Sequence, residues 1–200
     1  MKKIALILLI TFITYSCKGQ IIIPMNNDYV ETPDGAYLKD TENFLDKFVG
    51  TWKYQNGNEE FIIILKKEIN HFYKAYYKDI LYGEYKYVNP SGSTLVNTLD
   101  KIDFAYTSKS YHNISGASFI TNNLYVKCND CNPGEFRVKS NFDDPDRKGL
   151  IDTGVIFRYI NPMTINVKII GSKGKVLESD TDNKPDRLRV PSGEYIMTKQ

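Results

Sequence analysis

From residue 51 onward, apolar and polar side chains alternate along the chain, which is the pattern of β-strands buried on one face. The alternation is clearest in residues 135–142 and 163–170, where Val, Ile and Phe are interleaved with Arg, Lys and Asn. Roughly eight to ten strands are predicted. They lie near residues 51–55, 59–66, 69–78, 80–88, 94–99, 123–128, 135–142, 151–160, 163–170 and 193–198.

Short turn motifs separate these strands, among them Asn56-Gly57 and Asn132-Pro133-Gly134. Links this short join antiparallel strands and leave no room for parallel βαβ units. A large antiparallel sheet has two unpaired edges unless it closes or doubles over. The pattern therefore predicts an all-β protein with an antiparallel β-barrel, and a β-sandwich is the alternative. Residues 107–122, rich in Ser, Asn and Gly, are predicted to form a long loop or lid.

One short helix is predicted before the first strand. Phe44, Leu45 and Phe48 fall at helical spacing within residues 40–48. Thr41 is placed to cap the N-terminus of this helix, since its hydroxyl can accept from the first free backbone N–H groups. The predicted order is thus one short helix followed by hairpins.

The first residues form an export signal. Lys2 and Lys3 precede the apolar run 4–13, which has the length of a signal-peptide core and is shorter than the ~20 residues of a typical membrane-spanning helix. The run leads into Thr14-Tyr15-Ser16-Cys17, which resembles a bacterial lipobox. That resemblance implies that Cys17 is acylated and becomes the first residue of the mature protein. An ordinary secretory peptide with a chance cysteine is the alternative.

These features predict three segments: a lipoprotein signal peptide over residues 1–16, a tether over 17–39 and a barrel domain over 40–200. Residues 17–39 contain Pro24, Pro33 and several Asn and Asp residues, a composition that cannot form a compact unit alone. Ile21-Ile22-Ile23 is the part of this tether apolar enough to add an edge strand to the domain.

Charge and composition narrow the range of partners. The chain has 26 Lys and Arg against 24 Asp and Glu, and cleavage would remove Lys2 and Lys3, which balances the two sets. A nucleic-acid-binding protein is expected to carry a basic surplus, so that class is excluded. The hydrophobic fraction of 42% also excludes a disordered chain.

The segment Gly50-Thr51-Trp52, between the predicted helix and the first hairpin, resembles the opening of lipocalin-like barrels. The resemblance implies that Gly50 turns the chain into the first strand and that Trp52 closes the barrel floor. It also implies an arginine over this Trp, here Arg187 or Arg189. A core position in any β-domain explains Trp52 equally well.

Over nearly all of its mature length the chain also resembles a family of small lipoproteins from Bacteroidota-type bacteria, a domain of unknown function. The residues that carry this resemblance are the leader, Ser16-Cys17, Gly50-Thr51-Trp52 and the ending 195–199. Surface-exported members of such families carry acidic residues close behind the cysteine, and none stands there in this chain. The resemblance therefore implies a lipid-anchored protein of the cell envelope, on the periplasmic face of the outer membrane.

Cys128-Asn129-Asp130-Cys131 is the sharpest local motif after the leader. Turn residues follow it and strand-like residues flank it, whereas a redox-active Cys-x-x-Cys opens a helix. Export and an even pair of cysteines favour a structural disulfide between Cys128 and Cys131, with a redox pair as the alternative.

The remaining candidates for chemistry lack partners in the sequence. His71 and His112 are isolated, and no nucleophile elbow is present. Residues 171–175 depart from a phosphate-binding loop, and residues 180–186 depart from an EF-hand, in which Pro185 replaces a required glycine. The sequence therefore predicts no catalytic residue, no metal site, no cofactor and no enzymatic activity. Weak calcium binding at 180–186 or 143–146 is the exception left open.

A cluster of aromatic residues is the candidate ligand-binding set: Phe72, Tyr73, Tyr76 and Tyr77. Within one continuous strand, Phe72 and Tyr76 share one face, and Tyr73 and Tyr77 share the other. One set is then available to line a cavity and stack on a ligand, although sheet stabilisation explains the same residues.

The sequence predicts a membrane-anchored, non-enzymatic barrel that binds a small apolar molecule in or near its lumen. The alternative is a protein-interaction or envelope-structural module whose barrel is filled by side chains.

Overall fold

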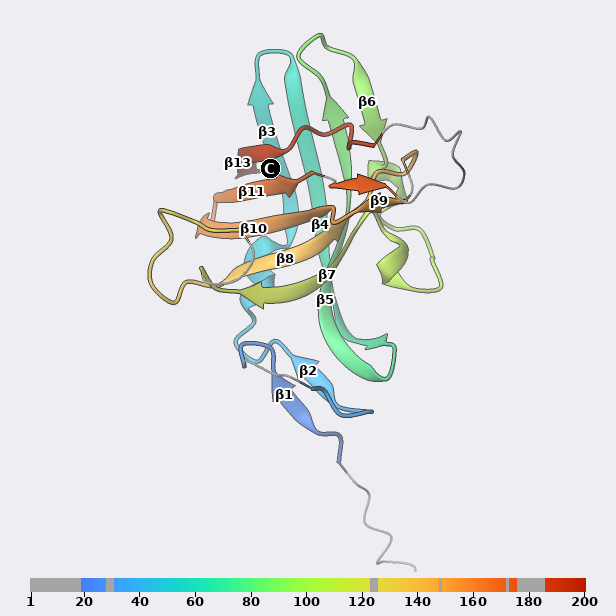
Figure 1. Ribbon diagram of the computed structural model, residues 1–200, viewed down its shortest axis with the longest axis vertical. Helices are drawn as coiled ribbons and strands as arrows, with labels where there is room; N and C mark the ends of the chain where they lie inside the picture. Colours follow the sequence, from blue (N-terminus) through green and yellow to red (C-terminus); the bar gives the residue numbers. More distant parts are fainter. Residues whose placement is uncertain (1–18, 28–30, 123–125, 148, 172, 176–185) are drawn as a thin grey trace, which may run out of the picture.

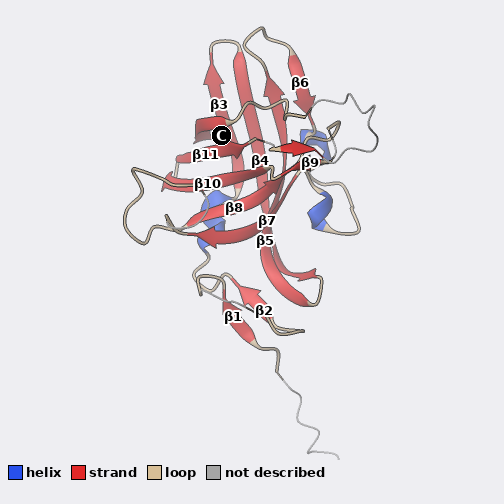
Figure 2. Ribbon diagram, viewed as in Figure 1, coloured by secondary structure: helices blue, strands red, loops and turns tan. Residues whose placement is uncertain are grey.

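The computed structural model describes residues 19–27, 31–122, 126–147, 149–171, 173–175 and 186–200 (Figure 1). Within these residues the protein is all-β, as predicted, and contains no α-helix (Figure 2). Its helical turns there are short 3-10 segments, η1 (Phe44–Phe48), η2 (Leu99–Lys101) and η3 (Lys109–Tyr111).

Eight antiparallel strands form a closed barrel, which confirms the barrel and excludes the sandwich. Around the barrel the order is β5-β4-β3-β13-β11-β10-β8-β7, and β7 closes the circle by pairing with β5 between Gly116 and Leu81. The strands are β3 (Gly50–Asn56), β4 (Glu59–Tyr73), β5 (Tyr76–Val88), β7 (Ile114–Ile120), β8 (Arg137–Phe142), β10 (Gly154–Asn161), β11 (Thr164–Ile170) and β13 (Gly193–Lys199).

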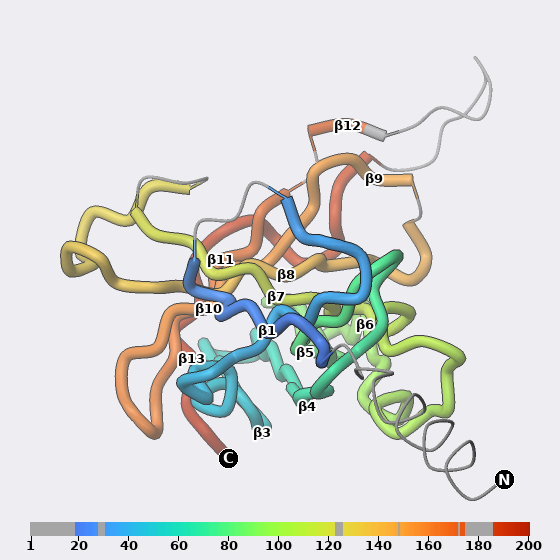
Figure 3. The backbone as a smooth tube through the Cα atoms, turned by 90° about the horizontal axis from the view of Figure 1, so that it is seen from below, coloured from blue at the N-terminus to red at the C-terminus, as the bar shows by residue number. Residues whose placement is uncertain are grey.

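Short strands lie outside this circle; β1 (Ile22–Pro24), β2 (Tyr37–Lys39) and β6 (Thr94–Asn97) extend the barrel sheet, and β9 (Leu150–Ile151) and β12 (Gly174–Lys175) form a separate two-stranded sheet. β6 pairs with the upper part of β5. β1 and β2 run parallel to each other, and β2 continues the sheet along the lower part of β5. The range 17–39, predicted as a tether, therefore contributes two strands, which lie across the lower end of the barrel (Figures 1 and 3).

The structure corrects the predicted strand over 69–78. β4 ends at Tyr73 and β5 begins at Tyr76, so this range spans a hairpin whose turn residue Lys74 has a φ of 58°. Alternation of apolar residues continues through the turn, and pattern alone could not show where the chain reverses.

The structure also corrects the loop or lid predicted over 107–122, because β7 is a barrel strand within it. The polar residues of β7 hide its period, and a bulge at Gly116, with a φ of 89°, shifts the register between Ser115 and Ser118. Of the strand predicted near 123–128, residues 123–125 lie outside the described residues and 126–128 are not in a strand.

The predicted N-terminal helix is a single 3-10 turn. It begins after Asn43, whose φ is 52°, and Thr41 is not its N-cap. Asp40 instead accepts hydrogen bonds from the backbone N–H groups of Phe44 and Leu45, both at 2.8 Å. A buried carboxylate thus satisfies the first free donors of the turn.

The inward-facing residues fill the barrel. The Phe61 ring lies at the centre of an aromatic group and makes edge contacts with Tyr85, Tyr87, Phe142 and Tyr195, with centroid distances from 5.1 to 6.4 Å. Edge-to-face pairs of this kind add stability beyond the area that they bury. A dense aromatic core therefore holds the strands together.

Candidate functional site

Gly50 and Trp52 lie at the start of β3, directly after η1. The Trp52 side chain is buried, and its Nε1 donates a hydrogen bond of 2.7 Å to the Phe48 carbonyl oxygen at the end of η1. Gly50 has a φ of 135°, and a Cβ atom there would lie 2.8 Å from Cε of Lys199. The Lys199 ammonium in turn lies 5.2 Å from the centre of a Trp52 ring. The end of the Lys199 side chain can move aside, so it is mainly the φ of 135° that favours glycine at this position.

The arginine expected over Trp52 lies elsewhere. Arg189 donates hydrogen bonds to both oxygens of the buried Asp144 carboxylate and to the Leu95 carbonyl oxygen. The Arg187 side chain is exposed and lies 3.8 Å from Asp186. The cation that contacts Trp52 is therefore a lysine of β13, and the role expected for Arg187 or Arg189 is wrong for this chain.

The barrel interior leaves no room around its inward-facing side chains. Five of these residues, from β3, β4, β8 and β11, are at most 1% exposed. They are Trp52, Ile63, Leu65, Val138 and Val167. A void large enough for a water molecule would expose the side chains that line it. These residues therefore pack against one another, which is the arrangement of a filled barrel.

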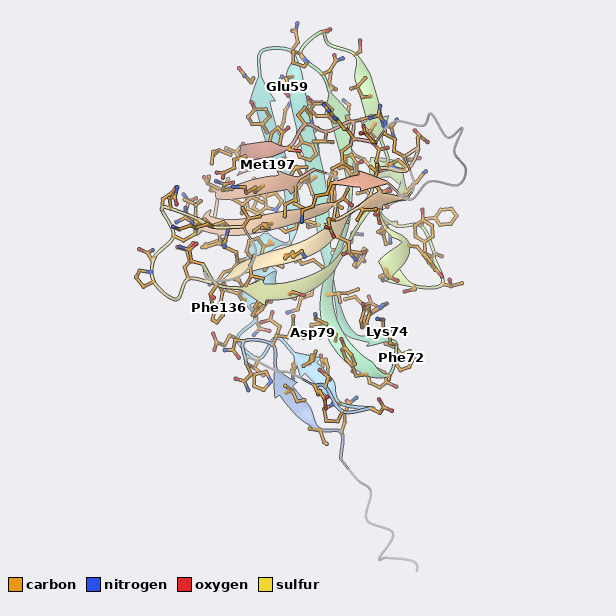
Figure 4. All side chains as sticks on the ribbon, in the orientation of Figure 1. Glu59, Phe72, Lys74, Asp79, Phe136 and Met197 are labelled. Atoms are coloured by element: carbon orange, nitrogen blue, oxygen red, sulfur yellow. A yellow bond between two sulfur atoms is a disulfide. The ribbon has the colours of Figure 1, made fainter. Side chains whose placement is uncertain are left out.

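The predicted ligand-binding aromatics lie at the end of the β4–β5 hairpin, outside the barrel (Figure 4). Phe72 is opposite Tyr77 with ring centroids 5.2 Å apart, and Tyr73 is opposite Tyr76 at 5.6 Å. The prediction for one continuous strand, in which Phe72 shares a face with Tyr76 and Tyr73 with Tyr77, is therefore wrong. Because the chain reverses at the turn, Phe72 shares a face with Tyr77, and Tyr73 shares a face with Tyr76.

One of these faces borders a pocket of about 220 Å³ between the hairpin and the outer side of β7 and β8. We call it the outer pocket. Its lining residues are Tyr73, Tyr76, Lys78, Ile80, Ser115, Gly116, Ala117, Ser118, Lys139, Ser140 and Asn141. It arises because β5 leaves the barrel below Leu81, whereas β7 turns away with β8. Two of the four predicted ligand-binding residues therefore line a real pocket, on the outside of the barrel.

Lys78 is the most unusual group in the outer pocket. Its Nζ donates a hydrogen bond of 3.5 Å to Ser118 Oγ, and it forms no ion pair with a carboxylate of the described residues. Burial lowers the pKa of Lys78 to about 8. The pocket lining contains two lysines and several hydroxyl groups but no acidic residue. Its chemistry thus suits a negatively charged group.

A second pocket, of about 630 Å³, adjoins the outer pocket at Lys139 and Asn141, which line both. It extends over the outer side of β8 towards β9 and is lined mainly by polar and charged residues. The remaining lining residues are Val126, Asp143, Leu150, Asp152, Thr153, Ile170 and Lys173. The two pockets together provide a polar hollow on the outside of the barrel.

A buried polar cluster lies on the outer side of β5, beneath the segment that carries η2 and η3. The His112 Nδ1 atom is 2.9 Å from Glu84 Oε1, and Asn113 Nδ2 donates to Glu84 Oε2 at 2.6 Å. The rings of Tyr82 and Tyr106 lie 4.8 and 4.9 Å from the His112 ring. His112 is isolated in the sequence but paired in the structure, because the fold brings it next to Glu84, which lies 28 positions earlier in the chain.

The other isolated histidine, His71, lies near the hairpin end, where its Nε2 is 3.3 Å from Ser108 Oγ. Burial lowers the pKa of His71, so at neutral pH its imidazole is uncharged. In an activated nucleophile the histidine that contacts the serine is oriented by a third group at its other ring nitrogen. His71 has no such hydrogen bond among the described residues, and His112 is paired with Glu84 and contacts no serine or cysteine there.

The disulfide between Cys128 and Cys131 is present, with an S–S distance of 2.03 Å. It lies in the loop before β8, where Asn122 and Cys128 exchange two hydrogen bonds of 2.6 Å. No helix follows Cys131 in the described chain, so the dipole that activates redox cysteines is missing there. The bridge stiffens a loop, in line with the structural interpretation.

The candidate calcium sites and the leader are the remaining features that the sequence singled out. The described residues contain no group of three His, Cys, Asp or Glu side chains placed to hold a metal ion. Of residues 143–146, Asp144 is bound by Arg189. Cys17, the leader and residues 180–185 lie outside the described residues. None of the helical segments that the structure describes has the length and apolar character needed to cross a bilayer.

Comparison with known proteins places the chain in a family. The model of the family of unknown function DUF6705 matches residues 1–200. Comparisons with curated proteins and with solved structures gave no match. The chain, an all-β barrel with its polar hollow on the outside, belongs to the DUF6705 family of unknown function.

Proposed function

We propose that this protein is a lipid-anchored, non-enzymatic binding module of the cell envelope that takes an acidic segment of a protein partner in its outer pocket. Acyl chains on Cys17 hold it on the periplasmic face of the outer membrane. The support for this location is the leader, with its basic start, apolar core and Ser16-Cys17 junction.

The filled interior favours the alternative that the sequence leaves open, a protein-interaction module, over a module that binds a small apolar ligand in its lumen. A small apolar ligand needs an apolar void of roughly 300 Å³ or more. The inward-facing residues, from Trp52 to Val167, are instead packed against one another. The barrel is therefore a rigid scaffold, and binding takes place on its outer surface.

The single observation that carries the partner class is Lys78 in the outer pocket. Its ammonium group is partly removed from water, and no carboxylate of the described residues compensates it. A buried charge without a partner is unfavourable, and a carboxylate from outside would restore the balance. Tyr76 at the pocket rim adds the aromatic surface that is typical of interface hot spots.

The absence of enzymatic activity is part of the proposal and has its own support. The buried acidic residues that the structure describes are engaged in structural contacts. Asp40 accepts from η1, Asp79 from three groups around β2, Glu84 from His112 and Asn113, and Asp144 from Arg189. A general acid or base needs a reacting group within hydrogen-bond reach, and these carboxylates are already occupied.

Photo-crosslinking in the native host tests the partner. A benzoyl-phenylalanine is placed at Asn141, which is exposed and lines both pockets, and as a control at Ile196 on β13, which is 55% exposed. We expect one discrete crosslinked protein from Asn141 and none from Ile196. Its yield should fall about tenfold with Lys78→Met and stay unchanged with Lys101→Glu, a charge reversal on η2. The same product with and without Lys78 would overturn the acidic-partner proposal.

Mass spectrometry of the protein extracted from host membranes tests the anchor. The expected mass is that of the chain from residue 17 onward with acyl groups on its first residue. An uncleaved leader, or an unmodified Cys17, would contradict the lipoprotein part of the proposal.

A further inference from the structure

We propose that the lower end of the molecule is a membrane-contact surface, which seats the barrel on the lipid bilayer in one fixed orientation. This inference rests on the proposed lipid anchor. We define the apolar end as four exposed residues, two at the end of β4 and two at the start of β1: Ile21, Ile22, Phe72 and Tyr73. Each of them is at least 41% exposed. Large apolar side chains gathered in this way mark an interaction surface.

The strand register places two members of the apolar end on one face of the sheet. Ile22 is opposite Tyr37, Tyr37 is opposite Tyr77, and Tyr77 is opposite Phe72. Residues aligned across neighbouring strands point to the same side, so Ile22 and Phe72 share a face across four strands. This spacing is about 14 Å, since strands lie ~4.8 Å apart. Ile22 and Phe72 are thus the exposed side chains at the two edges of this face, with the buried Tyr37 between them.

Hydrogen bonds fix this part of the sheet to the barrel. Asp79 is buried, and its carboxylate accepts from Tyr37 Oη at 2.5 Å and from the backbone N–H groups of Asp40 and Asn70, both at 2.9 Å. These bonds join β2, β5 and the bulge in β4. Because β5 continues directly into the barrel wall, the apolar end and the barrel move together.

The position of the anchor identifies the occupant as a lipid surface. Ile21 lies four positions after Cys17 in the chain, and four positions span at most about 14 Å. Acyl chains on Cys17 would therefore enter the bilayer within that distance of the apolar end. β1, which begins at Ile22, lies at this same end of the molecule, beside the hairpin (Figure 1).

The composition of the hairpin end matches the interfacial region of a bilayer. Tyr and Phe are suited to the boundary between lipid tails and headgroups. Lys74, at the turn, lies with its ammonium 5.4 Å from the Tyr73 ring, where it can reach the headgroups while the ring is buried. Interfacial insertion reaches roughly 5–10 Å, so the tip enters the bilayer and Lys78, further up β5, stays above it.

The test uses the acylated protein from host membranes, reconstituted in vesicles of phosphatidylethanolamine and phosphatidylglycerol whose acyl chains carry bromine. Phe72→Trp is compared with Phe104→Trp, since both phenylalanines are 59% exposed. Phe104 is the control because it lies far from the apolar end. Its neighbour Asp103 pairs with Lys66, and Lys66 is about 20 Å from Phe72 along β4. Trp52 gives a constant background because its side chain is fully buried.

We expect the fluorescence of the Phe72→Trp variant to shift to shorter wavelength and to fall by at least about half in brominated vesicles, because bromine quenches on contact. The Phe104→Trp variant should match the unaltered protein. Equal quenching of both variants, or of neither, while the protein is acylated and floats with the vesicles, overturns the membrane-contact surface and leaves the anchor standing. An unmodified Cys17 overturns both. A crosslinker placed at position 72 tests the other occupants. If it captures a protein or a second copy of this chain while the Phe72→Trp variant is not quenched, the apolar end belongs to that partner and the inference is overturned.

Discussion

Glu84 and His112 form a hydrogen-bonded pair, 2.9 Å apart, whose two side chains are fully buried on the outer side of the barrel wall. They are covered by the segment between β6 and β7, and Tyr82 and Tyr106 pack against the imidazole. The pair fastens that segment to β5. Removing one member leaves a polar group buried without its partner, which costs more than removing both.

A double-mutant cycle on this pair should therefore be strongly non-additive. His112→Leu leaves the Glu84 carboxylate with Asn113 alone, and we expect a loss of about 3–5 kcal/mol in the free energy of unfolding. Glu84→Leu with His112→Leu should cost less than the sum of the two single changes. Urea denaturation of the four proteins measures the cycle. Additive losses would show that the pair does not act as a unit.

Gly50 should tolerate no side chain. Its φ of 135° and the nearby Lys199 Cε atom predict that Gly50→Ala lowers the free energy of unfolding by about 1–3 kcal/mol. Gly193→Ala is the matched control, because a Cβ atom there meets no atom within 4 Å. Thermal unfolding followed by circular dichroism compares the two. Equal midpoints for both variants would argue against a tight join between β3 and β13.

Lys78 should give the protein a distinctive response to alkaline pH. Burial lowers the pKa of Lys78 to about 8, below its value of 10.5 in the unfolded chain. Between these values the unfolded state binds more protons, so stability rises as pH increases from about 8 to 10.5. Lys78→Met should raise the melting temperature at pH 7 and remove that rise. Melting curves collected from pH 7 to 10.5 for both proteins check this, and a rise that survives in the variant would exclude Lys78 as its source.

The Cys128–Cys131 bridge should have a modest effect on stability. It closes a short loop, for which the chain-entropy model gives about 2 kcal/mol. Arg158 and Arg137 hold the neighbouring carbonyl oxygens of Asp130 and Val126 independently of the bridge. Cys128→Ala with Cys131→Ala should therefore lower the melting temperature and leave the fold intact. Loss of the near-UV aromatic circular dichroism signal would mean that the barrel depends on the bridge.

The sequence by itself determined the fold class, because a period of two and frequent turn motifs leave few alternatives to a closed antiparallel sheet. It also indicated Gly50 and Trp52 as special positions at the start of the first barrel strand, and Cys128 and Cys131 as a pair. These signals are local in the chain: a glycine before a tryptophan, or two cysteines around two turn residues. Residues that interact within a few positions leave a readable pattern.

The tertiary structure alone decided where binding can occur. β7 was hidden because its polar residues and the Gly116 bulge break the period, and the faces of Phe72 and Tyr76 were reversed because the turn at Lys74 carries no strong sequence signal. The Glu84–His112 pair and the Lys78 pocket join residues distant in sequence, brought together when β5 and β7 close the barrel. Such contacts depend on strand register, which a single sequence does not encode locally.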